Sequence, residues 1–514
     1  MKGWKRHWSV CVLFGMSMFF CGQAAFGQQT ASAAREQLYI ALEEVINLAL
    51  QNNLDISIKQ YNPEIQKEAI RKAEAAFDSS TKSSYSHTFY ESESSSRPVG
   101  LSSLDASISK LFQFGGSCEV SFDTDVSFYD GTASSPAIDQ VTGEPYLQET
   151  DLDNDYKHTL TMQYSHPLLK NFGTDVNTAA IKIATTNRDI SVSQLRATVI
   201  DVLTNVKNAY WSLVDAIAEL EANKQSLQLA YDLVEINEAQ VNVGTLAPIE
   251  VLQAKSQAAS REVSVTSAEQ AVLNAEDRLK QLLNFAEDDP IWAAAIVPTD
   301  QPSEKQPTLS LQDAIATALE NREELKQLQQ AIQIQEYALN VAANQLKPEL
   351  YMVGNLSLSG DDTTYSDALG ELSGFDNVGV TVGASFSYDL GNRAAKSSYH
   401  QTKLALDQKK LSVRNMEKAI FVDVRVKLRN VETAYNLIGA TRIARQLSEE
   451  QLDAEQKKFN EGLSTNFQVL SYQDELTQAR TSESQAITAY NQALAELDEA
   501  IGMTLHRHNI AIEE

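Results

Sequence analysis

The feature that most constrains this chain is a helical stretch too long for an ordinary globular domain. Residues 177–243 contain neither proline nor glycine, and apolar side chains recur along them at steps of three and four residues. The members of this seam are Val192, Leu195, Val199, Val202, Val206, Tyr210, Leu213, Ile217 and Leu220. Such a heptad-type seam is typical of a helix that packs along its whole length against other helices. At 1.5 Å per residue, the helix would be on the order of 100 Å long.

The long helix is predicted to be one arm of a helical hairpin that occurs twice. The first arm ends near Gly244, and a second helical pattern continues from about Pro248 to Phe285. In the second half of the chain, a seam over about Arg393–Phe459 turns at Gly462 and comes back to about residue 502. Val206, Tyr210, Leu213, Ile217 and Leu220 are matched at one constant offset by Val424, Leu428, Val431, Tyr435 and Ile438. Two equal hairpins of this length indicate an internal duplication.

Each half of the chain also opens with the same short helical pattern. The stretch Leu42–Asn53 aligns with Leu311–Arg322 at one constant offset, through leucines, isoleucines and an alanine-leucine pair. Each opening leads into a further amphipathic helix, and these helices are expected to end near Phe77 and Leu346.

Between these helices and the long hairpins, the apolar period changes from that of a helix to that of a strand. The first half carries four alternating stretches within about residues 83–166, and the second half carries two within about residues 350–390. Their length suits strands that cross an outer membrane at a tilt. The turn at residues 114–117 is tight, whereas the connections at about 92–101 and 130–157 are long and polar. Short turns at one end and long loops at the other are typical of outer-membrane barrels.

The N-terminus reads as a secretory signal peptide. A basic start at residues 1–6 is followed by an apolar run over about 10–20 and by small residues, with cleavage expected after Gly27. The apolar run is shorter than the roughly 20 residues of a membrane span, which disfavours an anchor. Phe20 is too large for the site before a lipidated cysteine, which disfavours a lipoprotein cleaved at Cys21.

The expected export and the net charge exclude an internal disulfide and argue against nucleic-acid binding. Cleavage removes Cys11 and Cys21, so Cys118 is the only cysteine expected in the mature chain, and no internal disulfide can form. The chain has 42 basic and 69 acidic residues, and loss of Lys2, Lys5 and Arg6 brings the formal charge from −27 to about −30. An anionic chain of this kind argues against nucleic-acid binding, which requires clustered lysine and arginine.

The sequence carries no motif for catalysis, metal binding or a cofactor. Its seven histidines are scattered and none has a metal-ligand spacing. Asp151, Asp153 and Asp155 resemble the start of a calcium loop, but Tyr156 and Met162 stand where the loop glycine and the bidentate acid are required. A solvated loop is the favoured interpretation there. The sequence therefore predicts no enzyme, no cofactor and no metal site.

The ordered set of elements resembles the TolC family of outer-membrane efflux proteins over essentially the whole mature chain. The segments that carry the resemblance are the paired openings at 42–53 and 311–322, the barrel exit His166-Pro167-Leu168-Leu169 with Phe172-Gly173, and the two tip turns. The resemblance implies a mixed α and β membrane protein: a homotrimer whose shared β-barrel crosses the outer membrane and whose coiled-coil hairpins form a periplasmic tunnel. It also implies that an inner-membrane pump delivers substrates through a periplasmic adaptor docked at the tunnel tip, with outer-membrane lipid around the barrel.

The expected organisation follows from this order of elements. It consists of a signal peptide at 1–27, a first repeat at 28–286, a proline-rich linker at 287–308, a second repeat at 309–505 and an exposed C-terminal tail at 506–514. The two long hairpins are expected at about 177–285 and 393–502. Such hairpins cannot bury both of their seams alone, and six strands are fewer than the roughly eight of the smallest membrane barrels, so both structures require neighbouring chains.

The tips of the hairpins are the predicted adaptor-docking site, where glycine tolerates the positive φ that a reversal often needs. The residues concerned are Val243, Gly244, Thr245 and Leu246 in the first hairpin and Gly462, Leu463 and Ser464 in the second. Both leucines are expected to be exposed beside the turns. Pump-linked family members often carry acidic residues just after the second tip glycine. Here the candidate entrance residues are Gln468 and Ser471, with Glu250 at the equivalent place in the first hairpin. The sequence therefore does not reproduce the acidic ring of such members. Two interpretations of Glu250 are equally open, a residue of the entrance and a surface carboxylate.

Two alternatives remain open at this point. A periplasmic structural or adhesive coiled-coil protein without a pore would explain the heptads but not the amphipathic strands. Within the channel architecture, a conduit for type I protein secretion is not separable from small-molecule efflux.

The first half carries one more pair of strands than most family members, at about 103–112 and 117–128. If the pair lies in the barrel, each chain gives six strands and the trimer about eighteen. A hairpin on the extracellular or equatorial surface would show the same alternation.

Overall fold

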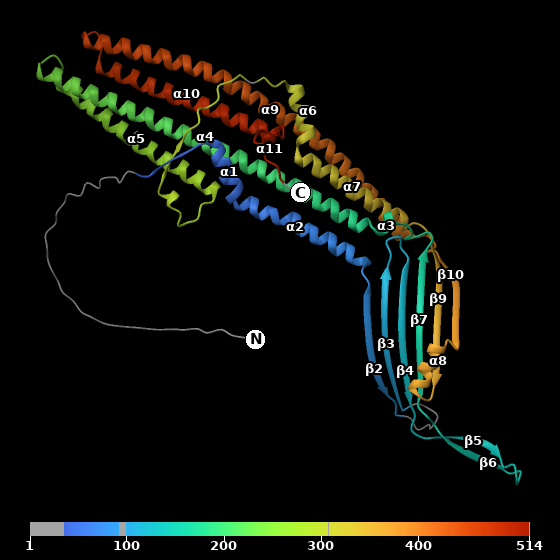
Figure 1. Cartoon of the computed structure of the whole chain (residues 1–514). Coiled ribbons are helices and arrows are strands. Elements are labelled where there is room, and N and C mark those ends of the chain that lie inside the picture. Colours follow the sequence, from blue (N-terminus) through green and yellow to red (C-terminus); the bar gives the residue numbers. More distant parts are fainter. Residues whose placement is uncertain (1–34, 92–98, 307, 513–514) are drawn as a thin grey trace, which may run out of the picture.

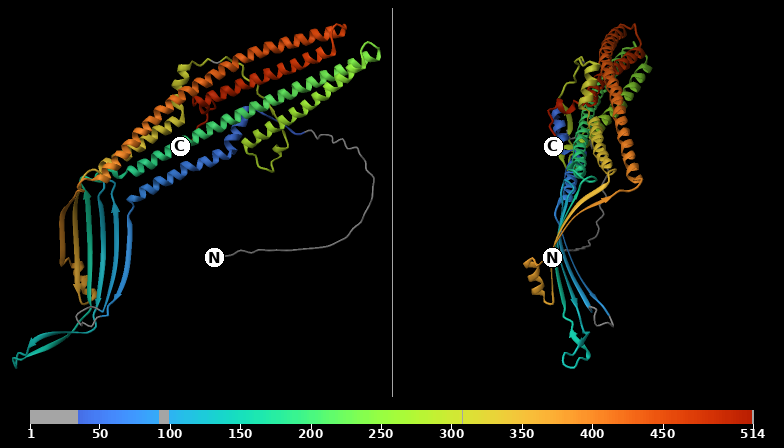
Figure 2. Two further views of the ribbon diagram at one scale, coloured as in Figure 1. Left: turned by 180° about the vertical axis from the view of Figure 1, so that it is seen from behind. Right: turned by 90° about the vertical axis from the view of Figure 1, so that its right-hand side faces the viewer.

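The structure is a computed structural model that describes residues 35–91, 99–306 and 308–512; the expected signal peptide lies outside these residues. The chain forms an elongated helical body joined at one end to a single twisted sheet (Figure 1). The two hairpin tips lie at the far end of the helical body from the sheet (Figure 2). Both predicted hairpins are present, with helices α4 (Ala179–Asn242) and α5 (Pro248–Leu283), and α9 (Arg393–Asn460) and α10 (Asn466–Ala500). A four-residue helix, α3 (Thr174–Asn177), precedes α4.

The shorter helices extend the body toward the sheet. They are α1 (Leu42–Asn52) and α2 (Leu54–Glu74) in the first repeat, followed by a short 3-10 turn, η1 (Ala75–Phe77), and α6 (Leu311–Asn321) and α7 (Glu323–Asn344) in the second. Asn53 separates α1 from α2 because its side chain accepts hydrogen bonds from the backbone N–H groups of Asp55 (2.9 Å) and Ile56 (3.3 Å), which caps the second helix. None of the helices in the described ranges has an apolar stretch long enough to cross a membrane.

The helical body is a wall of helices that lie side by side. Near the sheet the order across the wall is α2, α4, α7 and α9, and toward the tips α5 and α10 take the places of α2 and α7 (Figure 1). Only α4 and α9 run the whole length, which explains why their seams dominate the sequence.

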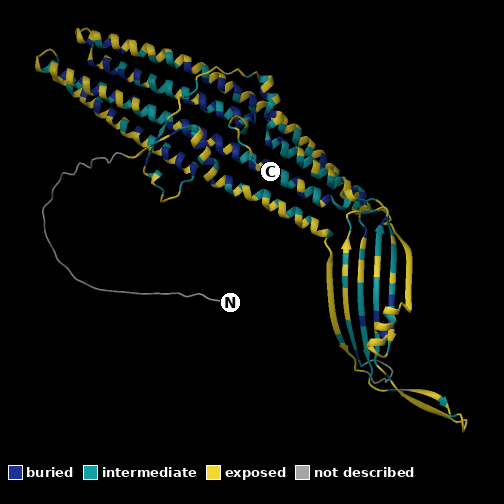
Figure 3. Ribbon diagram, in the orientation of Figure 1, coloured by how far each residue is buried: buried dark blue, intermediate teal, exposed yellow. Residues whose placement is uncertain are grey.

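Each repeat has its own apolar core where the short and long helices meet. The first core joins Val45 and Ile46 of α1 to Leu203 and Tyr210 of α4, and the second joins Ala314 and Ala318 of α6 to the Val424 region of α9. The repeat seams found in the sequence, such as Val206 with Val424, are therefore equivalent core positions. Burial follows these stripes along the helices, while large parts of the sheet remain exposed (Figure 3).

The linker between the repeats is fixed to the wall rather than loose. It contains a 3-10 turn, η2 (Pro290–Trp292), and a strand, β8 (Ala295–Pro298), which pairs in parallel with β1 (Gln37–Ile40). The buried Tyr210 hydroxyl donates to Asp300 Oδ2 at 2.8 Å, and the Tyr490 hydroxyl donates to the Lys305 carbonyl.

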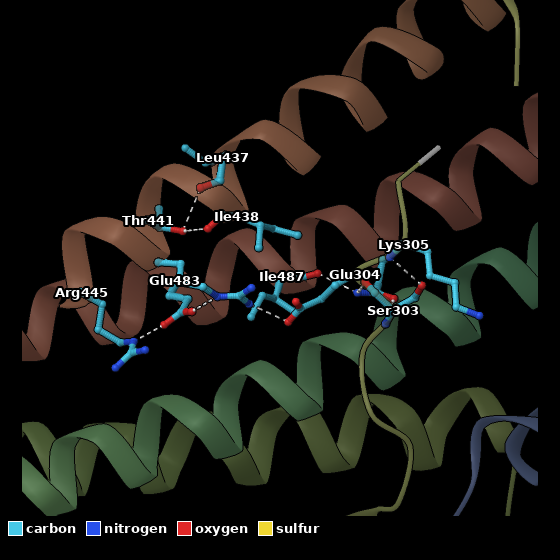
Figure 4. A network of polar contacts seen from close by, with 11 residues as sticks. Ser303, Glu304, Lys305, Leu437, Ile438, Thr441, Arg445, Glu483 and Ile487 are labelled. Atoms are coloured by element: carbon cyan, nitrogen blue, oxygen red, sulfur yellow. Dashed lines mark hydrogen bonds and ion pairs between the residues drawn. The ribbon is translucent and has the colours of Figure 1, made fainter. Parts of the chain in front are cut away.

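Polar contacts attach the following stretch of the linker to the second hairpin (Figure 4). Asn491 donates to the Ser303 carbonyl at 3.2 Å, Arg442 binds Glu304 at 2.8 Å, and Arg442 and Arg445 both bind Glu483. The linker therefore fixes the second hairpin to the first, although the sequence indicated only a loop here.

All six predicted strands belong to one antiparallel sheet, in the order β10-β9-β7-β4-β3-β2. The pair β3–β4 lies inside the sheet, because β3 pairs with β2 and β4 pairs with β7, so the alternative of a surface hairpin is wrong. The strands are β2 (Ser80–Phe89), β3 (Gly100–Leu111), β4 (Ser117–Phe128), β7 (Asp155–Pro167), β9 (Glu349–Asp362) and β10 (Asn377–Ser387).

Two connections expected to be loops contain regular structure. A separate hairpin, β5 (Thr132–Ile138) and β6 (Pro145–Asp151), projects beyond the end of the sheet (Figure 1). A helix, α8 (Tyr365–Gly374), begins after Thr364, whose hydroxyl accepts from the Asp367 N–H at 3.3 Å. Both elements were missed because their apolar residues follow no clear period.

The C-terminal segment is less exposed than predicted. Residues 506 and 507 are exposed, but α11 (Thr504–Arg507) begins at a fully buried residue, and Leu505, Ile510 and Ile512 pack against the core of the first repeat. The interpretation of residues 506–514 as a free tail was therefore wrong for residues 510 and 512. This segment joins the end of the second repeat to the beginning of the first.

The packing of this segment makes the thermal stability of the protein depend on pH. Burial, together with the nearby charges of Lys207 and Arg507, lowers the pKa of His508 to about 4. The folded state therefore favours the neutral imidazole, and stability present above the ordinary pKa of about 6.5 is lost as the pH falls toward 4. We expect His508→Gln to melt at the wild-type temperature at pH 7.5 and several degrees above the wild type at pH 4.5.

The measurement is thermal unfolding of the detergent-solubilised protein at both pH values. Burial raises the pKa of Asp498 to about 6, which has the opposite pH dependence, but this group is common to both proteins and cancels in the comparison. Equal losses of melting temperature in the two proteins would contradict the assignment to His508.

Candidate functional site

The sheet has one mostly apolar face and one polar face. Directly paired residues share a face, and the pairs Val120–Met162, Phe122–Leu160 and Leu358–Val378 all lie on the same side. The apolar face is formed by Leu104, Ala106, Ile108, Val120, Phe122, Val126, Leu160, Met162, Leu356, Leu358, Val378, Val380, Val382 and Phe386. A sheet that exposes this face to water would be unstable, and lipid is the medium that suits it.

The opposite face carries serine, threonine, asparagine and acidic side chains. Asp105 and Asp123 are direct partners across β3 and β4. Both accept hydrogen bonds from serine hydroxyls, since Ser84 donates to Asp105 at 3.0 Å and Ser121 donates to Asp123 at 3.0 Å. Ser103 similarly donates to Asp125 at 2.6 Å. Such a face suits water, so the sheet has the alternation of a pore wall.

Helix α8 covers the loop end of the apolar face. Tyr365 makes an edge-to-face contact with His158 at a centroid distance of 4.6 Å, and His158 is fully buried between Thr124 and this helix. Gly360 permits the approach, since a Cβ there would overlap the Ala368 carbonyl. In the right-hand view of Figure 2, α8 and the C-terminal end of the chain lie on the same side of the molecule. The apolar face of the sheet is thus continuous with the side of the wall that carries the C-terminal segment.

The two lateral edges of the molecule are open along their whole length. On the sheet, β2 and β10 are edge strands, and every residue of β10 is exposed. On the wall, α2 is the outer helix on the side of β2, and α9 is the outer helix on the side of β10 (Figure 1). Each of these two helices carries a stripe of exposed apolar side chains. The stripes consist of Leu54, Ile58, Tyr61 and Ile65 on α2, and Leu404, Leu411, Val422 and Val426 on α9.

The predicted tip residues lie at the two reversals. Gly244 and Gly462 have φ of +78° and +73°, so both turns use the conformation that favours glycine. Leu463 is 79% exposed, as expected, but Leu246 is half-buried, which corrects the expectation that both leucines are exposed. Ser464 is partly turned inward, since its hydroxyl donates to Glu455 Oε1 at 2.5 Å.

The tips carry further exposed apolar side chains that were not predicted from the sequence. On the first hairpin, Ile249 and Leu252 are exposed near the predicted Val243, and on the second, Phe467 is exposed near Leu463. These residues follow the turns at helical spacing, which is the signal that could have identified them.

The candidate entrance residues are not equivalent. Gln468 forms a capping box with Thr465, in which the Gln468 N–H donates to the Thr465 hydroxyl at 3.3 Å. The Glu250 carbonyl accepts hydrogen bonds from Asn237 at 3.4 Å and Asn466 at 3.3 Å, which joins the two hairpins near their tips. Ser471 is half-buried one turn further on. Of the three, only Glu250 carries a carboxylate.

An ion pair joins the two hairpins further from the tips, and it was not predicted from the sequence. Arg261 of α5 is buried and binds Asp474 of α10 at 2.8 Å, while it donates to the Ser226 hydroxyl of α4 at 2.6 Å. Burial lowers the pKa of Arg261 and the Asp474 carboxylate opposes this shift. The contact could not be found from spacing, because its partners lie in different repeats.

The described residues contain no cluster of three or more histidine, cysteine, aspartate or glutamate side chains that could hold a metal ion. Asp151 and Asp155 flank the connection between β6 and β7.

The candidate site consists of a sheet with one apolar and one polar face and of two apolar tips. A helical wall about 100 Å long joins the sheet to the tips.

Comparisons with known proteins agree with this geometry. The family model described as outer membrane efflux protein matches residues 132–284 and 314–503. Three solved structures with similar folds are outer-membrane proteins. CmeC of Campylobacter jejuni is 17% identical, with a TM-score of 0.61 over 90% of this chain and 85% of that one.

VceC of Vibrio cholerae is 16% identical, with a TM-score of 0.62 over 90% of this chain and 96% of that one. MtrE of Neisseria gonorrhoeae, solved in an open state, is 14% identical, with a TM-score of 0.59 over 90% and 89%. No curated protein matches the chain.

The two faces of the sheet predict how fast a cysteine on each face reacts with a water-soluble maleimide. Cys118 is the second residue of β4 and shares the apolar face with Val120, so it should react slowly with a water-soluble maleimide in intact outer membrane and rapidly after denaturation. The control is Ser117→Cys in a Cys118→Ser background, which moves the thiol by one residue to the polar face and should label rapidly in the folded protein. Rapid labelling of Cys118 in the folded protein would contradict the assignment of the faces.

Proposed function

The chain belongs to the outer membrane efflux protein family, and on this premise we propose that it works as a homotrimer that receives its substrates from an inner-membrane pump through a periplasmic adaptor. It is an outer-membrane channel-tunnel for efflux, with a barrel in the outer membrane and a helical tunnel in the periplasm. The family consists of transport channels rather than enzymes. The alternative of a periplasmic coiled-coil protein without a pore is not favoured.

The proposal is based on the two lateral edges of the protomer, which have no partner within the chain. In the chain, β2 and β10 each present a row of unpaired backbone groups, and lipid offers them no partner. The apolar stripes of α2 and α9 continue the same two edges along the wall. A head-to-tail ring pairs β10 with the β2 of the next protomer and α9 with its α2, and such a ring closes without leaving an edge.

The direction of the strands supports the same ring. Neighbouring strands alternate in direction across the whole sheet, so β2 and β10 run in opposite directions. The β10 of one protomer and the β2 of the next therefore meet as an antiparallel pair, which matches every other contact in the sheet.

Transport through such a tunnel is passive. The lumen is lined by the polar face of the sheet, and the energy for transport is supplied by the partner pump. The pump class and the choice between small molecules and proteins as cargo are set by the partner that docks at the tip.

The function predicts a stable trimer that conducts ions. We expect light scattering of the detergent-extracted protein to give three times the monomer mass, and planar bilayers containing it to show discrete channel steps. A stable folded monomer would overturn the proposed assembly, and a trimer without conductance would overturn the pore.

The tip is proposed to dock the adaptor through exposed apolar side chains. Leu463 contributes nothing to the core, so Leu463→Asp should leave the trimer and its melting temperature unchanged and reduce efflux at least tenfold. This change tests docking better than a substitution of Gly462, whose positive φ would strain any other residue.

A matched control is Leu147→Asp, which changes an exposed leucine of the projecting β5–β6 hairpin at the opposite end of the molecule. Efflux measured in cells that express both variants at equal levels should fall only for Leu463→Asp. Wild-type efflux by that variant would remove the support for docking at this turn.

A further inference from the structure

The strand pair β3–β4 gives this channel a wider opening in the outer membrane than four strands per chain could provide. We propose that the trimer forms an eighteen-stranded barrel and that its outer-membrane section admits solutes too bulky for a twelve-stranded one. The inference rests on the proposed trimeric channel and adds the width of its membrane section.

The first support is the hydrogen-bonded register. β3 pairs with β2 over ten residue pairs, from Ser80–Ser109 to Phe89–Gly100, and β4 pairs with β7 over eleven, from Ser117–Ser165 to Ser127–Asp155. The pair therefore separates β2 from β7 along their full length. While β3 and β4 stay folded, β2 and β7 cannot pair with each other directly. The strands β3 and β4 are therefore part of the barrel wall.

The second support is that the pair has the same two faces as the rest of the sheet. Leu104, Ile108 and Val120 lie on the apolar face, and Asp105 and Asp123 lie on the polar one. A hairpin in water has no reason to continue an apolar band that begins on its neighbours. The uninterrupted band places β3 and β4 at the same depth in the membrane as β7 and β9.

The third support is the turn that joins the two strands. Gly115 has φ of +99°, and a Cβ there would overlap the Asn171 carbonyl and lie 2.8 Å from Asn177 Nδ2. The Phe114 carbonyl accepts a hydrogen bond from the Gly173 N–H at 3.2 Å. The turn is thus packed into the joint where β7 passes into the helical wall, so it belongs to the periplasmic rim of the barrel.

The consequence for width follows from strand geometry. Strands about 4.8 Å apart that tilt by about 40° give a backbone diameter of roughly 36 Å for eighteen strands and roughly 24 Å for twelve. The backbone diameter in the membrane is therefore about one and a half times that of a trimer with four strands per chain. The added strands turn mainly serine and acidic side chains to the lumen.

The test removes the pair and measures the opening. The Val99 N–H donates to the Phe128 carbonyl at 2.7 Å, so the two ends left by deletion of residues 100–128 already lie together. The remaining strands still alternate in direction, which allows a twelve-stranded ring to close. The opening is sized by the largest polyethylene glycol that enters from the extracellular side and lowers the single-channel current.

The matched control is deletion of residues 132–151, which removes the projecting β5–β6 hairpin without changing the sheet. Its ends are also adjacent, because the Leu152 N–H donates to the Gly131 carbonyl at 3.2 Å. We expect the wild type and this control to share one polymer cut-off. Deletion of residues 100–128 should lower the cut-off radius by at least about one and a half-fold, because the lining side chains take up the same depth in both barrels. Equal cut-offs in all three proteins would overturn the eighteen-stranded barrel.

A second measurement covers the case in which the shortened protein does not fold. Single cysteines at residues 103–108, in a Cys118→Ser background, should alternate in their reaction with a water-soluble maleimide. Positions 103, 105 and 107 should label rapidly, and positions 104, 106 and 108 should label at least tenfold more slowly until the protein is denatured. Uniform rapid labelling would place the pair in water and overturn the proposal.

These outcomes separate the inference from the function on which it rests. A wild-type protein that gives no channel steps contradicts the channel itself. A conducting wild type with the same cut-off as the deletion of residues 100–128 contradicts only the wider barrel.

Discussion

Unpaired backbone in lipid is the constraint on which the rest of this structure depends. Within the described chain, β2 and β10 each leave one side of an entire strand without hydrogen-bond partners. Each such group costs several kcal/mol in a hydrocarbon environment. Since the apolar stripes of α2 and α9 lie on the same two sides, the protomer is unfinished along its full length, and its folding and assembly are linked by mass action.

The helical wall meets a second constraint, which is the choice of register. Heptad seams permit two long helices to slide by seven residues with little loss of apolar contact. Here, buried polar contacts between particular positions on neighbouring helices prevent such sliding. Arg261 with Asp474 and Ser226, the Tyr210 hydroxyl with Asp300, and the Asn466 contact to the Glu250 carbonyl each fit only one alignment.

The sequence could predict those elements whose environment imposes a strict period. The hairpins α4–α5 and α9–α10 and all six strands of the sheet were found because helix packing and a lipid face each repeat along the chain. The β5–β6 hairpin and α8 have neither constraint and were read as loops. Strands β1 and β8 pair in parallel although they are about 250 residues apart, and no local pattern reports such a contact.

For the functional site, the tip glycines were predictable because a helix reversal demands positive φ, whereas the Arg261–Asp474 contact depends on how two repeats meet in space. The burial of Ile510 and Ile512 was hidden for the same reason. Their partners belong to the other end of the chain.

The place of β3 and β4 within the sheet has an evolutionary consequence. A strand that leaves the periplasm must be followed by one that returns, because each long helix has to begin on the periplasmic side. A protomer can therefore gain or lose only whole hairpins, and threefold symmetry multiplies each such event to six strands. Barrel width in this architecture changes in large steps rather than gradually, because the gain or loss of one hairpin of some thirty residues adds or removes six strands of the trimer.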